Sequence, residues 1–99
     1  MELQEFRVEI ARRLCAVRHE HELTQEALAE QLGISARHVQ FLEAARRGPS
    51  MELLFALGRC FGIKPGYFLD IEVGRADTLG SLPSAAEAQT TYHRSGKRV

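Results

Sequence analysis

The stretch from residue 24 to residue 44 constrains the fold of this chain most strongly. Thr24 precedes an apolar periodic segment, where a helix N-cap is favoured. Gly33 follows that segment, and glycine readily adopts the left-handed conformation that ends a helix. Ser35 is placed to cap a second helix. The pattern predicts two short helices joined by a tight turn at Gly33.

The second of these helices has two distinct faces. Val39 and Leu42 lie three residues apart and are expected to face the interior. At about 100° per residue, the outward face then carries Arg37, Gln40, Phe41 and Ala44, with Ala36 at its exposed N-terminal flank. This layout is that of a helix-turn-helix, which inserts a supported helix into the major groove of double-stranded DNA.

The flanking segments predict three more helices. Phe6, Ile10, Leu14 and Val17 form one stripe of an amphipathic helix at about 3–19. Ser50 caps a helix at about 51–61, whose interior residues are expected to be Met51, Leu54, Leu57 and Phe61. Pro65 suits the first turn of a short helix that ends near Leu69. We therefore expect an all-α, compact five-helix domain over residues 1–69 and a C-terminal tail over residues 70–99.

The composition of the tail differs from that of the domain. Gly74, Gly80, Pro83 and Gly96 interrupt any long periodicity, although Ser84 begins a capping box that permits a helix at about 85–93. The tail is either a mobile or partner-dependent segment or a dimerisation arm.

Charge is distributed unevenly along a chain whose net charge is zero. Residues 1–34 carry four Arg against seven Glu, whereas residues 35–64 carry five basic residues against two Glu. The positive segment begins with the helix after Ser35, which is the candidate recognition helix. Such a stripe can bind phosphate, but long-range attraction to DNA is weaker than for a strongly basic protein.

Several classes of protein are not expected. No run approaches the ~20 apolar residues of a membrane span, and the acidic N-terminus is unlike a signal peptide. Cys15 and Cys60 lie far apart and are interpreted as reduced packing residues of a cytoplasmic protein. His19 and His21 point apart on a helix, which argues against a metal site. With no phosphate loop or nucleophile motif, we expect neither an enzyme nor a cofactor.

A larger set of residues supports the same interpretation by its order and spacing. It comprises Arg18, Leu23-Thr24-Gln25-Glu26, Leu28-Ala29, Gly33-Ile34-Ser35, Val39, Leu42-Glu43, Pro49-Ser50, Leu54, Leu57, Phe61, Gly62 and Ile63. Together these residues resemble the Cro and phage-repressor type of helix-turn-helix domain, the XRE family, over roughly residues 7–69. The resemblance implies a sequence-specific DNA-binding transcriptional regulator. We expect a repressor that acts as a homodimer on an inverted repeat.

The resemblance also implies roles for particular residues. Gln25 is similar to the family glutamine that touches the DNA backbone and supports the recognition helix. Arg18 and Glu43 match an ion pair that links the first helix to the third. Ala36, Arg37 and Phe41 lie at positions similar to base-contacting residues of related repressors, and Arg46 and Arg47 lie in the loop that meets phosphate. We also expect the helix N-terminus at Ser35 to bind phosphate.

Three positions depart from the family pattern. Ala45 replaces the usual glycine after the recognition helix. Because left-handed alanine costs about 1–2 kcal/mol, we expect that helix to continue for one more turn, which would displace Arg46 and Arg47 from phosphate. Glu22 stands where the family often has glycine, and Ala36 replaces a commoner polar residue.

Each candidate contact has an alternative. Arg37 either binds the O6 and N7 atoms of guanine or remains a surface arginine that meets only phosphate. Phe41 either contacts a thymine methyl group or packs against the next helix or another chain. His38 either reaches phosphate or caps its helix. Gln40 is expected to support phosphate or Arg37 rather than to contact a base.

A homodimer is expected because one half-site gives little specificity. The candidate dimer surface comprises Phe61, Phe68, Leu69 and Ile71, since the short fifth helix has little else to bury them against. One alternative function is an antitoxin-type protein that binds a toxin through the tail and autoregulates its operon. Another is a bridging module that uses the fold without reading bases.

Overall fold

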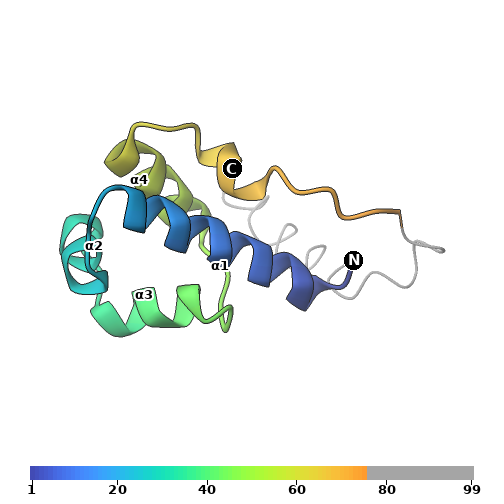
Figure 1. Cartoon of the computed structure of the whole chain (residues 1–99), viewed down its shortest axis with the longest axis horizontal. Coiled ribbons are helices and arrows are strands. Elements are labelled where there is room, and N and C mark those ends of the chain that lie inside the picture. Colours follow the sequence, from blue (N-terminus) through green and yellow to red (C-terminus); the bar gives the residue numbers. More distant parts are fainter. Residues whose placement is uncertain (76–99) are drawn as a thin grey trace, which may run out of the picture.

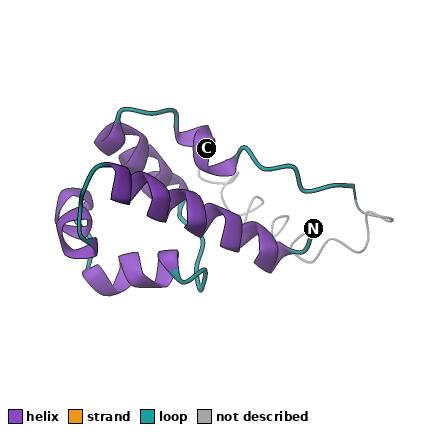
Figure 2. Cartoon of the chain, viewed as in Figure 1, coloured by secondary structure: helices purple, strands orange, loops and turns teal. Residues whose placement is uncertain are grey.

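The structure is a computed structural model that describes residues 1–75, and Figures 1 and 2 show these residues as helices joined by loops. The elements are α1 (Leu3–Glu20), α2 (Gln25–Leu32), α3 (Ala36–Glu43), α4 (Met51–Phe61) and the 3₁₀-helix η1 (Pro65–Leu69). The all-α prediction agrees with this part of the chain, whereas the fifth element is a 3₁₀-helix and not an α-helix. The helix expected at 85–93 lies outside the described residues. Across residues 1–75, no helix combines the length and the apolar character needed to cross a bilayer.

Helix boundaries follow the capping residues of the sequence. The hydroxyl groups of Thr24, Ser35 and Ser50 each accept a hydrogen bond from the backbone N–H three positions later, at 3.0 to 3.1 Å. Gly33 ends α2 with φ 72°, and Gly62 ends α4 with φ 68°. These caps satisfy backbone groups that a helix leaves unpaired at its ends.

The long helix α1 is central to the described fold. In Figure 1, α3 lies along one side of α1 and η1 along the other, and both contact α1. Every element contributes side chains to one core, which contains Ile10, Leu14, Val17, Leu28, Ala29, Val39, Leu42, Leu53, Leu57, Phe61 and Phe68. Burial of this core against α1 fixes the position of α3.

The inward face of α4 differs from the prediction. Met51, expected inside, is 81% exposed, and Leu54 is only half-buried at the edge of the core. Leu53, Leu57 and Phe61 form the buried stripe instead. Because residues 51–57 carry apolar side chains in several directions, their periodicity does not determine which side faces inward.

A close approach between α4 and η1 places Phe68 in the core. Gly58 is buried in α4, and a Cβ atom there would lie 2.7 Å from Cγ of Pro65, so glycine is required at this position. Arg13 of α1 donates a hydrogen bond to the carbonyl oxygen of Tyr67 at 2.7 Å. η1 is therefore held on both sides, and the Phe68 side chain is fully buried.

This burial corrects the reasoning behind the candidate dimer surface. Phe61 and Phe68 pack within their own chain and are not accessible to a partner. The assumption that η1 has nothing to bury its aromatic residue against was wrong, because α1 and α4 supply a core for it. Leu69 is 40% exposed, and Ile71 is half-buried at the core edge, so these two residues retain accessible apolar surface.

Candidate nucleic-acid interface

The exposed face of α3 is the candidate interface. Val39 is fully buried and Leu42 is 3% exposed, so both face the core. Arg37 and Gln40 are exposed on the other side, as is Ala44 just beyond the helix. The structure thus orients α3 in the predicted way and presents polar groups to solvent.

One predicted position at the start of α3, Ala36, is less accessible than expected. Ala36 is half-buried and packs against the core, so it does not lie on an exposed flank. The turn explains this, because the Ile34 N–H donates to the carbonyl oxygen of Ala29 and draws the chain inward. Ser35 is exposed, with its hydroxyl accepting from the backbone N–H of His38, whose side chain is half-buried.

A hydrogen-bonded network joins α1, α2 and α3. Arg18 donates from Nε to Oε2 of Glu43 at 2.6 Å and from Nη2 to Oε1 at 2.9 Å. Arg18 Nη1 also donates to the carbonyl oxygen of Leu23, and Gln25 Nε2 donates to Glu43 Oε1 at 2.9 Å. The two charged side chains are 10% and 7% exposed. Gln25 therefore supports α3 through Glu43, at the C-terminal end of that helix.

The network shifts the pKa of both charged groups. Burial alone would raise the pKa of Glu43, but the hydrogen bonds from Arg18 and Gln25 and the positive charge of Arg18 together outweigh burial and lower it. The hydrogen bond to Glu43 raises the pKa of Arg18. Both directions favour the charged pair, which holds the end of α3 against α1.

The end of α3 corrects the expected extra turn. The helix ends at Glu43, and Ala45 adopts the left-handed conformation with φ 60°. The Arg46 N–H donates to the carbonyl oxygen of Phe41 at 2.9 Å, and the Ala45 N–H donates to that of Leu42 at 3.2 Å. These two bonds define a Schellman motif, in which alanine occupies the usual glycine position.

Tertiary contacts explain why alanine adopts this conformation. Ala45 is 5% exposed, and its carbonyl oxygen accepts a hydrogen bond from Gln4 Nε2 of α1 at 3.0 Å. Burial of the methyl group and this hydrogen bond offset the ~1–2 kcal/mol cost of a left-handed alanine. Because the chain turns here, Arg46 and Arg47 lie in an exposed loop directly after α3. Glu22, the other departure from the family glycines, is likewise left-handed, with φ 55°.

Phe41 lies beside two of the candidate arginines. Cζ of Arg37 lies 5.1 Å from the centroid of the Phe41 ring, and Cζ of Arg47 lies 5.7 Å from it. Phe41 is half-buried, whereas both arginines are exposed. All three residues are candidates from the sequence, but their association is not evident there, because it depends on the path of the loop after α3.

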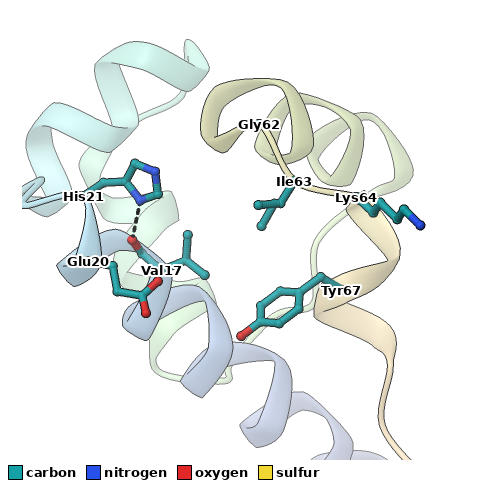
Figure 3. Close-up of a pocket in the computed structure, with 7 residues that line it drawn as sticks. All are labelled: Val17, Glu20, His21, Gly62, Ile63, Lys64 and Tyr67. Atoms are coloured by element: carbon teal, nitrogen blue, oxygen red, sulfur yellow. Dashed lines mark hydrogen bonds between the residues drawn. The ribbon is translucent and has the colours of Figure 1, made fainter.

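A hollow lies on another part of the molecule. It is bordered by the end of α1 and by the segment that joins α4 to η1, as Figure 3 shows. Val17 and Ile63 provide apolar surface, and Glu20, Lys64 and Tyr67 add polar groups at the rim. None of the predicted DNA-contacting residues lines this hollow. The hollow is therefore separate from the exposed face of α3.

Comparison with known proteins identifies the family. The profile of a family described as helix-turn-helix matches residues 16–68, which is more than half of the chain. The chain therefore belongs to this helix-turn-helix family, of the XRE type, as the sequence predicted.

One relative extends the comparison. A protein of Methanocaldococcus jannaschii, named an uncharacterized HTH-type transcriptional regulator, is 41% identical to this chain over 44 residues. The aligned region covers 44% of this chain and 67% of that protein.

Proposed function

We propose that this protein is a sequence-specific double-stranded-DNA-binding transcriptional regulator that acts as a repressor. α3 enters the major groove, and α2 lies across the DNA backbone. The observation that carries the proposal is the orientation of α3, with Val39 and Leu42 in the core and Arg37 and Gln40 in solvent. Membership of the helix-turn-helix family and the name of the archaeal relative support it.

The proposed contacts divide into base recognition and phosphate binding. Arg37 offers a planar set of N–H donors that matches O6 and N7 of guanine. The exposed side chains of Arg46 and Arg47 bind phosphate beside the groove, together with the N-terminus of α2 near Gln25. Because these are charge contacts, affinity falls steeply as salt concentration rises.

A homodimer on an inverted repeat completes the proposal. A symmetric dimer binds two half-sites whose centres lie about 34 Å apart, or a multiple of that distance. Leu69 and Ile71 are the residues of the original candidate surface that remain accessible to a partner. The proposed dimer surface is accordingly smaller than the sequence indicated.

Replacement of Arg37 tests the proposal. Arg37→Ala is expected to relax base preference at one position in each half-site and to weaken operator binding by about 5- to 150-fold, equivalent to about 1–3 kcal/mol. Selection of bound sequences from a random DNA pool, at fixed salt, measures the preference. Arg12→Ala is a matched control, because it removes one exposed positive charge from α1. Identical preferences for Arg37→Ala and the wild type would contradict base recognition by Arg37.

A further inference from the structure

The association of Phe41 with Arg37 and Arg47 indicates how this interface is organised. Arg37 precedes Phe41 by four residues on α3, a spacing that brings side chains together on one helix face. Arg47 approaches the same ring from the loop. Both guanidinium groups lie within the ~6 Å range of cation–π attraction.

The Schellman motif explains how Arg47 reaches the ring. The left-handed Ala45 reverses the chain immediately after α3, and the Arg46 N–H bonds back to the carbonyl oxygen of Phe41. Gln4 holds the carbonyl oxygen of Ala45 from α1. The backbone that carries Arg47 is therefore fixed relative to the last turn of α3.

The two guanidinium groups retain their hydrogen-bond donors in this arrangement. Within residues 1–75, no hydrogen bond or ion pair engages the side chain of Arg37 or Arg47. A cation–π contact attracts the charge of a guanidinium group and leaves its N–H groups available. Two positive charges beside one half-buried ring form a site suited to an anionic ligand that also offers hydrogen-bond acceptors.

We propose that Phe41 is a specificity-determining positioning residue that orders Arg37 toward guanine and Arg47 toward phosphate as one unit. This inference rests on the proposed function. The ring restricts both arginines before DNA arrives, so less side-chain freedom is lost on binding. It also sets the position of the base contact relative to the phosphate contact. Phe41 acts through the two arginines, in contrast to direct contact with a thymine methyl group.

Modified operators separate these two roles of Phe41. The operator selected by the wild-type chain is prepared with 7-deazaguanine at the Arg37-dependent guanine, which removes the N7 acceptor. A second operator carries deoxyuridine in place of the adjacent thymine, which removes the methyl group. Binding of wild type, Phe41→Leu, Phe41→Met and Phe41→Tyr is measured on each operator over a series of salt concentrations.

Loss of the aromatic ring is expected to disturb both arginine contacts. For the wild type, 7-deazaguanine weakens binding by about tenfold, within the range of a specific base contact. In Phe41→Leu and Phe41→Met that penalty falls to about twofold or less, and the salt slope decreases by about 1 because one phosphate contact is weakened. Phe41→Tyr retains the ring and both wild-type values. All variants show the same penalty for deoxyuridine as the wild type.

The possible results separate failure of the positioning role of Phe41 from failure of the proposed function. Phe41→Leu and Phe41→Met that keep the full 7-deazaguanine penalty but lose a deoxyuridine penalty would show that Phe41 contacts the methyl group, which overturns the positioning role. If Phe41→Leu or Phe41→Met kept the wild-type penalties on both modified operators and the wild-type salt slope, the positioning role would also be overturned, while DNA recognition would stand. A wild-type chain that enriches no sequence from the random pool would contradict the proposed function itself, and this inference with it. Thermal unfolding of each variant verifies that the domain is folded. If Phe41→Leu does not fold, Phe41→Met provides the test without the aromatic ring.

Discussion

Replacing Arg18 by methionine is expected to lower the free energy of unfolding by about 3–5 kcal/mol. Methionine keeps much of the apolar packing of the arginine stem but leaves the carboxylate of Glu43 buried without its cation. Gln25 then supplies the remaining side-chain hydrogen bond to Glu43. A loss of this size is a large fraction of the ~5–15 kcal/mol stability of a typical domain. Equilibrium denaturation by urea, followed by circular dichroism, measures it.

Two comparisons show whether the loss arises from the buried pair. Arg12→Met breaks an ion pair on the same helix whose arginine is 67% exposed, so it should lower stability far less than Arg18→Met does. The double variant Arg18→Met/Glu43→Leu removes both charges and should recover most of the loss. Equal effects of Arg18→Met and Arg12→Met, or simple addition in the double variant, would argue against a buried pair.

The same network predicts a pH dependence. Folding lowers the pKa of Glu43 below its ordinary value of 4.5. The stabilising contribution of the Glu43 carboxylate is therefore fully present above pH 4.5. That contribution is lost as pH falls through the lowered folded pKa. In Arg18→Met, burial of Glu43 dominates and favours the protonated carboxyl. The stability difference between wild type and variant should therefore shrink on acidification from pH 7, and a constant difference would contradict the pKa shift.

Replacing Phe68 by alanine is expected to destabilise the monomer by about 3–5 kcal/mol. Phe68 of η1 is fully buried against α1 and α4. Its removal leaves a cavity that the short 3₁₀-helix cannot fill. Thermal and urea unfolding of Phe68→Ala should show the loss at every protein concentration, because the contacts lie within one chain.

The neighbouring Leu69→Ala is the matched control. Leu69 is 40% exposed, so its truncation should change monomer stability by less than ~1 kcal/mol. A shift toward monomers in light scattering would support the proposed dimer surface. If Phe68→Ala left the unfolding curve unchanged and altered only the oligomeric state, Phe68 would belong to a surface and the described core would be wrong.

Local signals were sufficient to predict most helix boundaries and the orientation of α3. The three hydroxyl caps and the two left-handed glycines act within a few residues, so their effect is evident from the sequence. The spacing of Val39 and Leu42 identified the buried side of α3, because Arg37 and Gln40 occupy the opposite side.

The remaining features depend on contacts between distant segments. Ala45 is left-handed although its local preference opposes this, because its methyl group is buried and Gln4 holds its carbonyl oxygen. Phe68 lies in a 3₁₀-helix too short to show a periodicity, so the sequence could not show whether its own core or a partner covers it. The approach of Arg47 to Phe41 depends on the turn at Ala45. It was not predicted, because that turn is itself set by contacts between distant segments.

The most direct measurement of the central claim is methylation interference on the operator selected from the random pool. Dimethyl sulfate methylates N7 of guanine in the major groove and N3 of adenine in the minor groove. If α3 enters the major groove with Arg37 on guanine, N7 methylation of one guanine per half-site will prevent binding by the wild type and will have little effect on Arg37→Ala. Interference confined to adenine N3, or none at any base, would contradict the assignment of α3 as the recognition helix.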